Sequence, residues 1–245
     1  MTRASTAAIR KALPGASRAT SRPRARGSLT AIVTDRLREA IMDGRIGLGE
    51  TLSEVRLAEA LGVSRAPVRD ALTQLRIEGL IDVRPQAGSY VYVPSEDDVV
   101  ELSEFRAILE LTALRRGYAR QRGEMLRRMR LAVEQMERAR AVDDRLAVAR
   151  ADTAFHQAII ECGGNAYLID AYRLISGRVA ALRTHNLVMA DTVRKGSLSE
   201  HRALVAALSR GDLPRAEGIL ADHVHRMKQR FQPVAGRSPR MREVA

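Results

Sequence analysis

One aspartate and three histidines in the second half of the chain have the types and spacing of a metal site. Asp152 and His156 are four residues apart, so on a helix they share one face. His201 and His223 are equidistant from Asp212, where we expect a turn between two antiparallel helices. Equal steps from such a turn bring two residues to the same height, so both imidazoles could face the first pair. One carboxylate and three imidazoles suit a divalent first-row metal such as Zn²⁺, Ni²⁺ or Mn²⁺.

Each of these residues also has a simpler interpretation. Asp152 and His156 alone could be an ordinary pair on a helix surface, and His201 alone could belong to a polar helix start. The matched heights of the last two candidates favour a site over these alternatives. His185 has no partner at helical spacing, and His225 faces another direction, so neither is expected to bind the metal.

A second set of residues, in the segment 62–72, has the pattern of a helix that reads DNA. Ser64 can begin this helix, and Arg65 and Arg69 follow in its first turns. The predicted buried stripe contains Val68, Ala71, Leu72 and Leu75. The stripe rotated away from it contains Arg65, Arg69, Thr73 and Arg76. Arginine can bond two acceptors of guanine at once and also pairs with phosphates, whereas any single arginine here could belong to a solvated cationic face.

The surrounding elements predict a winged helix-turn-helix domain over residues 28–94. Helices are predicted at 28–43, 53–61 and 64–79, and strands at 80–84 and 90–93. The two strands would form a hairpin, the wing of the domain. Gly88 near its tip would let the backbone approach the minor groove closely, and Pro94 closes the domain.

Residues 95–232 have a helical pattern with brief interruptions, which predicts an all-α bundle large enough to enclose a core and a cavity. The fold class is therefore mainly α. The predicted helices are 96–120, 124–142, 145–162, 165–190, 198–209 and 213–231.

The net charge of +12 lies mostly at the two ends of the chain. Residues 1–27 contain seven basic residues and no acidic residue, and residues 233–245 contribute +2, which leaves only +3 between them. The charge alone is therefore weak evidence for a nucleic-acid partner. We expect both ends to be disordered tails, and the first to be a basic tail that attracts phosphates rather than a transit peptide.

Cysteine content and hydropathy favour a cytoplasmic protein. Cys162 is the single cysteine, so the chain can form no internal disulfide, and we expect this side chain in the core. No apolar run approaches the roughly 20 residues that a membrane-spanning helix needs, so no membrane partner is expected.

Residues 28–94 resemble the N-terminal domain of GntR-type bacterial transcription regulators. The resemblance is carried by Leu57-Ala58, Gly62-Val63-Ser64-Arg65-x-Pro67-Val68-Arg69-x-Ala71-Leu72, Leu75, Glu78-Gly79-Leu80, Gly88 and Val91. The chain departs from the pattern at Val55 and Ala87, where many members carry arginine. The candidate DNA-binding residues are Ser64, Arg65, Arg69, Thr73, Arg76 and Gly88.

The bundle resembles the FCD effector domain of the FadR-like branch of that family. The matching residues are Arg106-x3-Glu110, Asp152-x2-Phe155-His156, Gly164-Asn165, Glu200-His201, Ala207-x3-Gly211-Asp212 and His223. Many FCD domains hold a metal on such an aspartate and three histidines, and the open metal positions accept the carboxylate of a small organic acid. The resemblance thus implies that Asp152, His156, His201 and His223 bind a divalent metal, with Zn²⁺ or Ni²⁺ favoured.

Four further residues could contact the effector. Arg106 and Asn165 are the candidates, although the first could simply pair with Glu110 and the second could cap a helix. Arg178 and Arg183 are weaker candidates, because surface positions are commoner for arginine.

Together these features predict a homodimeric transcription regulator, most often a repressor in this family, that binds a near-palindromic double-stranded operator. A small organic acid at the metal would control its affinity for DNA. One alternative is a regulator that responds to the metal itself. A metal-dependent hydrolase is disfavoured because no nucleophile or general-base motif accompanies the four ligands, so no enzymatic activity is expected.

Overall fold

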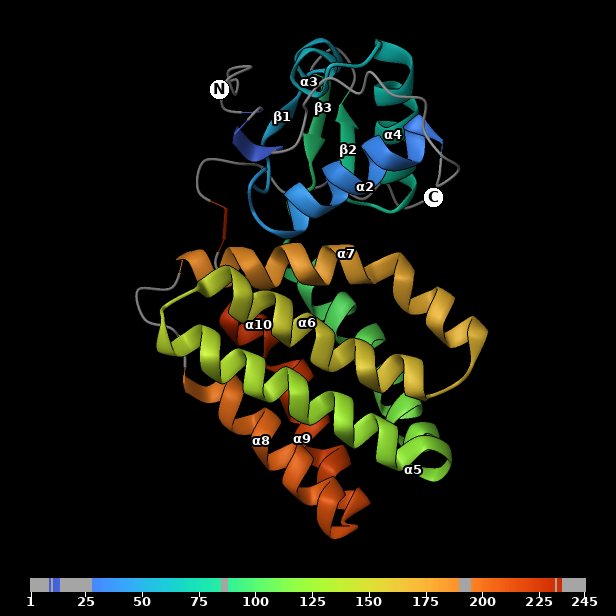
Figure 1. Ribbon diagram of the computed structural model, residues 1–245, viewed down its shortest axis with the longest axis vertical. Helices are drawn as coiled ribbons and strands as arrows, with labels where there is room; N and C mark the ends of the chain where they lie inside the picture. The colour runs from blue at the N-terminus through green and yellow to red at the C-terminus, as the bar shows by residue number, and fades with distance from the viewer. Residues whose placement is uncertain are drawn as a thin grey trace. The chain divides into compact units, whose positions relative to one another are not determined.

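The computed structural model describes residues 9, 11–13, 28–84, 88–189, 195–231, 233 and 234. The chain divides into two compact units, and the division falls between Pro94 and Ser95. We call them unit 1 and unit 2, and Figure 1 labels their elements.

Unit 1 combines helices with a small sheet. Its elements are α2 (Leu29–Met42), β1 (Thr51–Leu52), α3 (Glu54–Leu61), α4 (Arg65–Ile77), β2 (Ile81–Arg84) and β3 (Gly88–Val91). The described strands pair antiparallel in the order β1-β3-β2, with Tyr90 opposite both Thr51 and Asp82. Helices α3 and α4 with the β2–β3 hairpin form the predicted winged helix-turn-helix. Strand β1 was not predicted, because two residues are too few to show an alternating pattern.

The ends of the helices in unit 1 follow from local chemistry. The Ser28 hydroxyl accepts a hydrogen bond from the backbone N–H of Ala31 at 3.2 Å and so caps α2. Gly62 ends α3 in the left-handed conformation, with φ of 67°, which costs glycine little. This turn sets the direction in which α4 leaves α3. The core of unit 1 includes Leu37, Leu57, Leu75, Ile81 and Val91.

Part of the N-terminal segment that we expected to be disordered forms a helical turn. The backbone N–H of Leu13 donates to the carbonyl of Ile9 at 2.9 Å, and both side chains are buried. The Arg45 guanidinium also donates to the carbonyl of Ala12. The expectation was therefore wrong for residues 9 and 11–13, because two aliphatic side chains four residues apart give the turn an apolar face. The other residues of 1–27, and all of 235–245, lie outside the described residues.

Unit 2 is the predicted all-α bundle. Its helices are α5 (Glu96–Ala141), α6 (Arg145–Cys162), α7 (Ala166–Met189), α8 (Lys195–Arg210), α9 (Leu213–His225) and α10 (Met227–Arg230). Helix α6 packs against α5 and α7, and α5 also packs against α8 and α9, as the lower group of ribbons in Figure 1 shows. The mainly helical fold class is thus confirmed.

The largest differences from the predicted helix boundaries lie in unit 2. The interruption expected at Gly123 lies instead at Gln121, whose φ of −139° and ψ of 35° kink α5, while the helix continues through the glycine. Helix α8 begins at Lys195 rather than at residue 198, and the last predicted helix ends at His225 before the short α10. Periodicity places a helix well but its ends poorly.

Close contact between α5 and α6 fixes the core of unit 2. A Cβ added at Gly163 would lie 2.9 Å from the Cα of Ala113, so only glycine fits there. Phe155 and Met129 are fully buried nearby in the aliphatic core. Cys162 is also buried, as predicted, and its burial raises the pKa of the thiol. In the described part of the chain, every helix is too short or too polar to cross a membrane.

Candidate metal centre and DNA-reading helix

Helix α4 buries one stripe and exposes another, as its periodicity predicts. The residues of the predicted inner stripe, Val68, Ala71, Leu72 and Leu75, are all buried. Those of the predicted outer stripe, Arg65, Arg69, Thr73 and Arg76, are all exposed. The Thr73 hydroxyl donates to the backbone carbonyl of Arg69 at 3.0 Å, which leaves its oxygen lone pairs free to accept. The exposed stripe can therefore meet an anionic partner.

The residues at either end of this surface also keep polar groups accessible. Ser64 occupies the N-cap position of α4, but its hydroxyl makes no capping bond to the described residues. Gly88 begins β3 on the exposed side with φ of 98°, a conformation that favours glycine. Val55 and Ala87 are the two positions where the chain departs from the family pattern. Val55 is about half exposed on α3. Ala87 lies outside the described residues.

Asp152, His156, His201 and His223 converge inside unit 2. Each offers one ligand atom, and these four atoms lie within 4.8 Å of one another. His156 Nε2 lies 3.2 Å from His223 Nε2. The two Asp152 oxygens lie 3.6 Å from the Nε2 atoms of His156 and His201. All four side chains are buried, so the spacing seen in the sequence corresponds to one cluster.

Three helices supply these groups. Asp152 and His156 lie one turn apart on α6, while α8 carries His201 and α9 carries His223. Asp212 caps α9 by accepting from the backbone N–H of Arg215 at 3.1 Å, so it begins the helix on one side of the turn. The ring centroids of His201 and His223 are 4.5 Å apart, as the equal steps from the turn predicted.

Two glutamates that we did not assign to the site orient the imidazoles. Glu110 of α5 accepts from His156 Nδ1 at 2.7 Å, and Glu200 of α8 accepts from His223 Nδ1 at 2.6 Å. Tyr172 donates to the first of these glutamates at 3.2 Å. Metal-binding histidines commonly donate their second ring nitrogen to a carboxylate in this way. Both glutamates belong to the motifs quoted above, but their spacing alone did not show that they face histidines.

The side chains of this cluster suit the binding of a divalent cation. Because the glutamates accept from Nδ1, the Nε2 atoms of His156 and His223 present lone pairs to each other across 3.2 Å. His201 is buried, and within the described residues neither of its ring nitrogens has a hydrogen-bond partner. Buried polar atoms without partners are rare in proteins. A cation bound by one nitrogen of each imidazole and by the Asp152 carboxylate would give each of those nitrogens a partner.

Burial and nearby charges set the protonation states that a metal requires. Burial lowers the pKa of His201 to about 3, and burial with the Arg106 charge lowers the pKa of His156 well below its ordinary value. Burial would raise the pKa of Asp152, but Arg183 and the histidines hold it far below its ordinary value. Neutral imidazoles and an ionised carboxylate are the forms that bind metal.

Arg183 of α7 belongs to this cluster, contrary to our expectation of a surface position. Its Nε contacts Asp152, and its Nη1 donates to Thr153 at 2.7 Å. Its side chain is only 13% exposed, and its Nη2 has no hydrogen-bond partner among the described residues. The sequence does not single out this arginine, because its distance from Asp152 along the chain matches no helical period.

A partly open cavity of about 100 Å³ adjoins the metal cluster. Asp152 and His223 contribute to its wall from the metal cluster. The cationic residues of the lining are Arg106, Arg140, Arg183 and Arg230. Apolar residues, among them Met136 and Leu198, complete it. Arg106 and Arg230 are also paired with Glu110 and Glu200, so the four guanidiniums and three carboxylates of this group leave one net positive charge, which suits an anion.

The two residues proposed for effector contact have different positions. Arg106 pairs with Glu110, Nε to Oε1 at 2.6 Å, as its alternative interpretation predicted, and it also lines the cavity, as contact with an effector would require. Its Nη2 is buried without a hydrogen-bond partner among the described residues. Asn165 accepts from the backbone N–H of Leu168 at 3.3 Å, so it caps α7, and the cavity lining does not include it. The position of Asn165 thus fits the alternative interpretation, a helix cap.

Three other residues named in the sequence analysis lie outside the ligand set. His225 is exposed and its Nδ1 lies 2.8 Å from the carbonyl of Ala221, as expected for a residue away from the cluster. His185 is partly buried on α7 and is not among the grouped ligands of the described chain. Arg178 is partly buried and does not line the cavity.

Comparison with known proteins adds family information to this geometry. Residues 29–91 match the family described as "Bacterial regulatory proteins, gntR family", and residues 101–226 match the FCD domain. The chain is 31% identical over 206 residues to a protein of Paenarthrobacter nicotinovorans named "Probable D-xylose utilization operon transcriptional repressor", covering 84% of this chain and 90% of that protein. It is 29% identical over 214 residues to the Uxu operon transcriptional regulator of Escherichia coli, covering 80% and 83%.

The fold is also similar to solved structures. A GntR transcriptional regulator from Rhodococcus sp. RHA1 has a TM-score of 0.73 with 27% sequence identity, and the match covers 83% of this chain and 97% of that chain.

Proposed function

Because this chain belongs to the GntR family of bacterial transcription regulators and carries an FCD domain, we propose that it is a repressor controlled by a small organic acid bound beside a metal. Its families and relatives are regulators and not enzymes, which removes the hydrolase alternative. The observation that carries the proposal is the convergence of Asp152, His156, His201 and His223 at the wall of a cationic cavity.

On the DNA side, we propose that α4 enters the major groove of an operator. Arg65 and Arg69 would read guanine or pair with phosphates, with Thr73 and Arg76 further along the same exposed stripe. Ser64 at the helix start would meet a phosphate, and Gly88 of the wing would approach the minor groove. A homodimer would place two such helices on the half-sites of a near-palindrome.

On the effector side, we propose that the metal and the arginines of the cavity wall together bind an anion. A carboxylate would occupy open positions of a Zn²⁺ or Ni²⁺ ion held by the four ligands. The buried Nη2 atoms of Arg106 and Arg183 would donate to a second oxygen-bearing group of the acid. This combination favours small acids with two carboxylates, or with a carboxylate and a hydroxyl group.

Release of the operator by the effector requires that binding of the two oppose each other. If the acid lowers the affinity for DNA, then by linkage DNA lowers the affinity for the acid by the same factor. Two relatives carry names that connect them to operons, one as a repressor. A repressor released by its effector is the simplest regulator with these properties.

The test begins with the full-length protein and a random pool of DNA duplexes, from which bound sequences are selected. Binding of the selected duplex is then measured with metal-free protein, with ZnCl₂ or NiCl₂, and with metal plus a panel of mono-, di- and hydroxycarboxylic acids. We expect metal alone to leave the affinity unchanged and one class of acid to lower it at least fivefold. If DNA affinity follows the metal concentration alone, the protein is a direct metal-responsive regulator. If no acid acts at saturating metal, the proposal is refuted.

A further inference from the structure

Glu54, the first residue of α3, contacts both of the leading arginines of α4. Its Oε2 lies 3.2 Å from Arg69 Nη2 and 3.4 Å from Arg65 Nη2. Arg69 Nε also lies 3.3 and 3.4 Å from the two carboxylate oxygens. One carboxylate therefore bridges two cations that the DNA-binding function would use, and no role in that function has yet been given to it.

The contact leaves part of each guanidinium available. Arg69 turns its Nε and Nη2 edge toward Glu54, so Nη1 and the second hydrogen of Nη2 point away from that carboxylate and make no hydrogen bond to the described part of the chain. Guanine needs two donors from one side of an arginine. The side chains of Arg65 and Arg69 are about 60% exposed, so a base edge can reach them while Glu54 stays in place.

The same carboxylate also weakens the attraction of this surface for phosphates. Without Glu54, two exposed guanidiniums would present two positive charges that any DNA sequence could neutralise. With it, the group of three side chains carries one positive charge. Sequence-independent binding depends on such charges, whereas base reading depends on the position of donors.

We propose that Glu54 positions Arg65 and Arg69 for base reading and, at the same time, limits sequence-independent binding to DNA. The inference rests on the proposed operator binding by α4. It makes Glu54 a positioning residue that raises discrimination between an operator and other DNA, although a negative charge beside DNA lowers total attraction.

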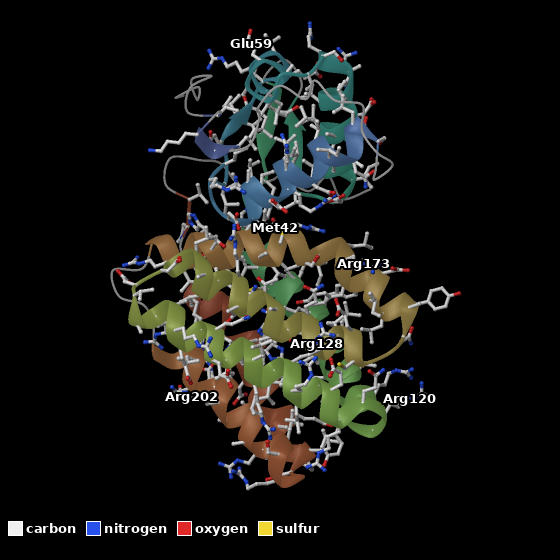
Figure 2. All side chains as sticks on the ribbon, in the orientation of Figure 1. Met42, Glu59, Arg120, Arg128, Arg173 and Arg202 are labelled. Atoms are coloured by element: carbon white, nitrogen blue, oxygen red, sulfur yellow. The ribbon has the colours of Figure 1, made fainter. Side chains whose placement is uncertain are left out.

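The experiment compares three variants with the wild-type protein: Glu54→Gln, Glu54→Asp and Glu59→Gln. Glu59 is exposed on the same helix α3, where Figure 2 labels it, and serves as a control for the loss of one negative charge. Binding is measured to the duplex selected by the wild type and to a shuffled duplex of the same composition. Circular dichroism and thermal unfolding confirm that each variant is folded.

We expect Glu54→Gln to change the two affinities in opposite directions. Affinity for the selected duplex should fall about five- to tenfold, because the arginines lose their support, near the lower end of the effect of one bidentate contact. Affinity for the shuffled duplex should rise about threefold, with a steeper salt dependence, because one opposing charge is gone. Glu54→Asp keeps the negative charge but moves the carboxylate away from the arginines, because its side chain is shorter. Its affinity for the selected duplex should fall, while its affinity for the shuffled duplex should stay at the wild-type value. Glu59→Gln should leave the ratio of the two affinities unchanged.

Several results would overturn the inference. An equal rise of both affinities in Glu54→Gln would show that the carboxylate only competes with DNA. An equal effect of Glu59→Gln would show that only net charge matters. A folded Glu54→Gln variant with wild-type affinities would show that the contact has no role. If the wild type selects no sequence at all, the proposed operator binding fails, which is a distinct outcome.

Discussion

The exposed arginines of α4 and the buried ligands of unit 2 handle charge in opposite ways. The side chains of Arg65 and Arg69 are exposed to solvent, and the carboxylate of Glu54 lies 3.2 to 3.4 Å from them. His156 and His223 are shielded from solvent, and each has a glutamate within 2.7 Å of its Nδ1. Water can satisfy the first pair, whereas only protein groups or a cation can satisfy the second.

This difference explains why the two regions depend on different numbers of elements. The cationic stripe needs one amphipathic helix, so its periodicity in the sequence is enough to describe it. The buried cluster needs α5, α6, α7, α8 and α9, because each buried charge or lone pair requires a partner of its own. Removing a partner should therefore have larger and more local consequences in unit 2.

The largest expected effect is the loss of the metal from a His223→Ala variant. The wild-type protein should hold about one divalent ion per chain by elemental analysis, and the variant none. A chelator should lower the unfolding midpoint of unit 2 in the wild type on the order of 10 °C, because bound metal contributes about 4 kcal/mol at a thousandfold excess over Kd. The chelator should not affect the variant. The control is His225→Ala, which changes an exposed histidine on the same helix and should keep its metal.

The next effect is the loss of sequence discrimination in Arg69→Ala. One bidentate contact is worth about 1 to 3 kcal/mol, and a two-fold dimer would carry it twice. The preference for a selected duplex over a shuffled one should thus fall by about a hundredfold in a gel-shift assay. Arg173→Ala removes an exposed arginine of α7, labelled in Figure 2, and should leave the preference intact. Retained discrimination in Arg69→Ala would exclude α4 as the reading helix.

A smaller effect is expected from Glu200→Gln. The amide can still accept from His223 Nδ1, but it makes the imidazole a weaker donor to the metal, so metal affinity should fall about tenfold. Calorimetric titration of the metal-free protein with Zn²⁺ measures this change. Glu217→Gln alters an acid of α9 that pairs with Arg115 outside the cluster, and it should bind metal as the wild type does.

The smallest effects concern the turn between α3 and α4. Gly62→Ala places a side chain in the left-handed region and should destabilise unit 1 by about 1 kcal/mol, although no atom would obstruct the new Cβ. Gly218→Ala makes the same change inside α9 with equally free space, and should stabilise unit 2 by about 0.5 to 1 kcal/mol. Chemical denaturation measures the change in the free energy of unfolding for each variant. If both changes had the same sign, the role assigned to the φ of Gly62 would be contradicted.

The sequence predicted those features that depend on one helix or on one turn. The stripes of α4 and the i, i+4 pair of Asp152 and His156 follow from helical periodicity alone. The pairing of His201 with His223 follows from the position of the turn at Asp212. These predictions needed only helical periodicity and the assumption of one antiparallel helix pair.

Features that depend on packing between distant segments were missed. Arg183 reaches Asp152 from another helix, and its position among 41 basic residues carries no distinguishing pattern. The contact of Glu110 with His156 spans 46 residues. The burial of Ile9 and Leu13 contradicted an expectation based on composition, because two aliphatic residues within a basic segment do not change its average.

The burial of Cys162 has a practical consequence for spectroscopy. Its thiol is inaccessible in the α5–α6 core and its pKa is raised, so reagents that attack thiolates should spare it. A cysteine introduced at an exposed position such as Tyr167 or Asp35 would then take a fluorophore or spin label selectively. The native protein thus serves directly as the background for distance measurements between its two units, with and without DNA.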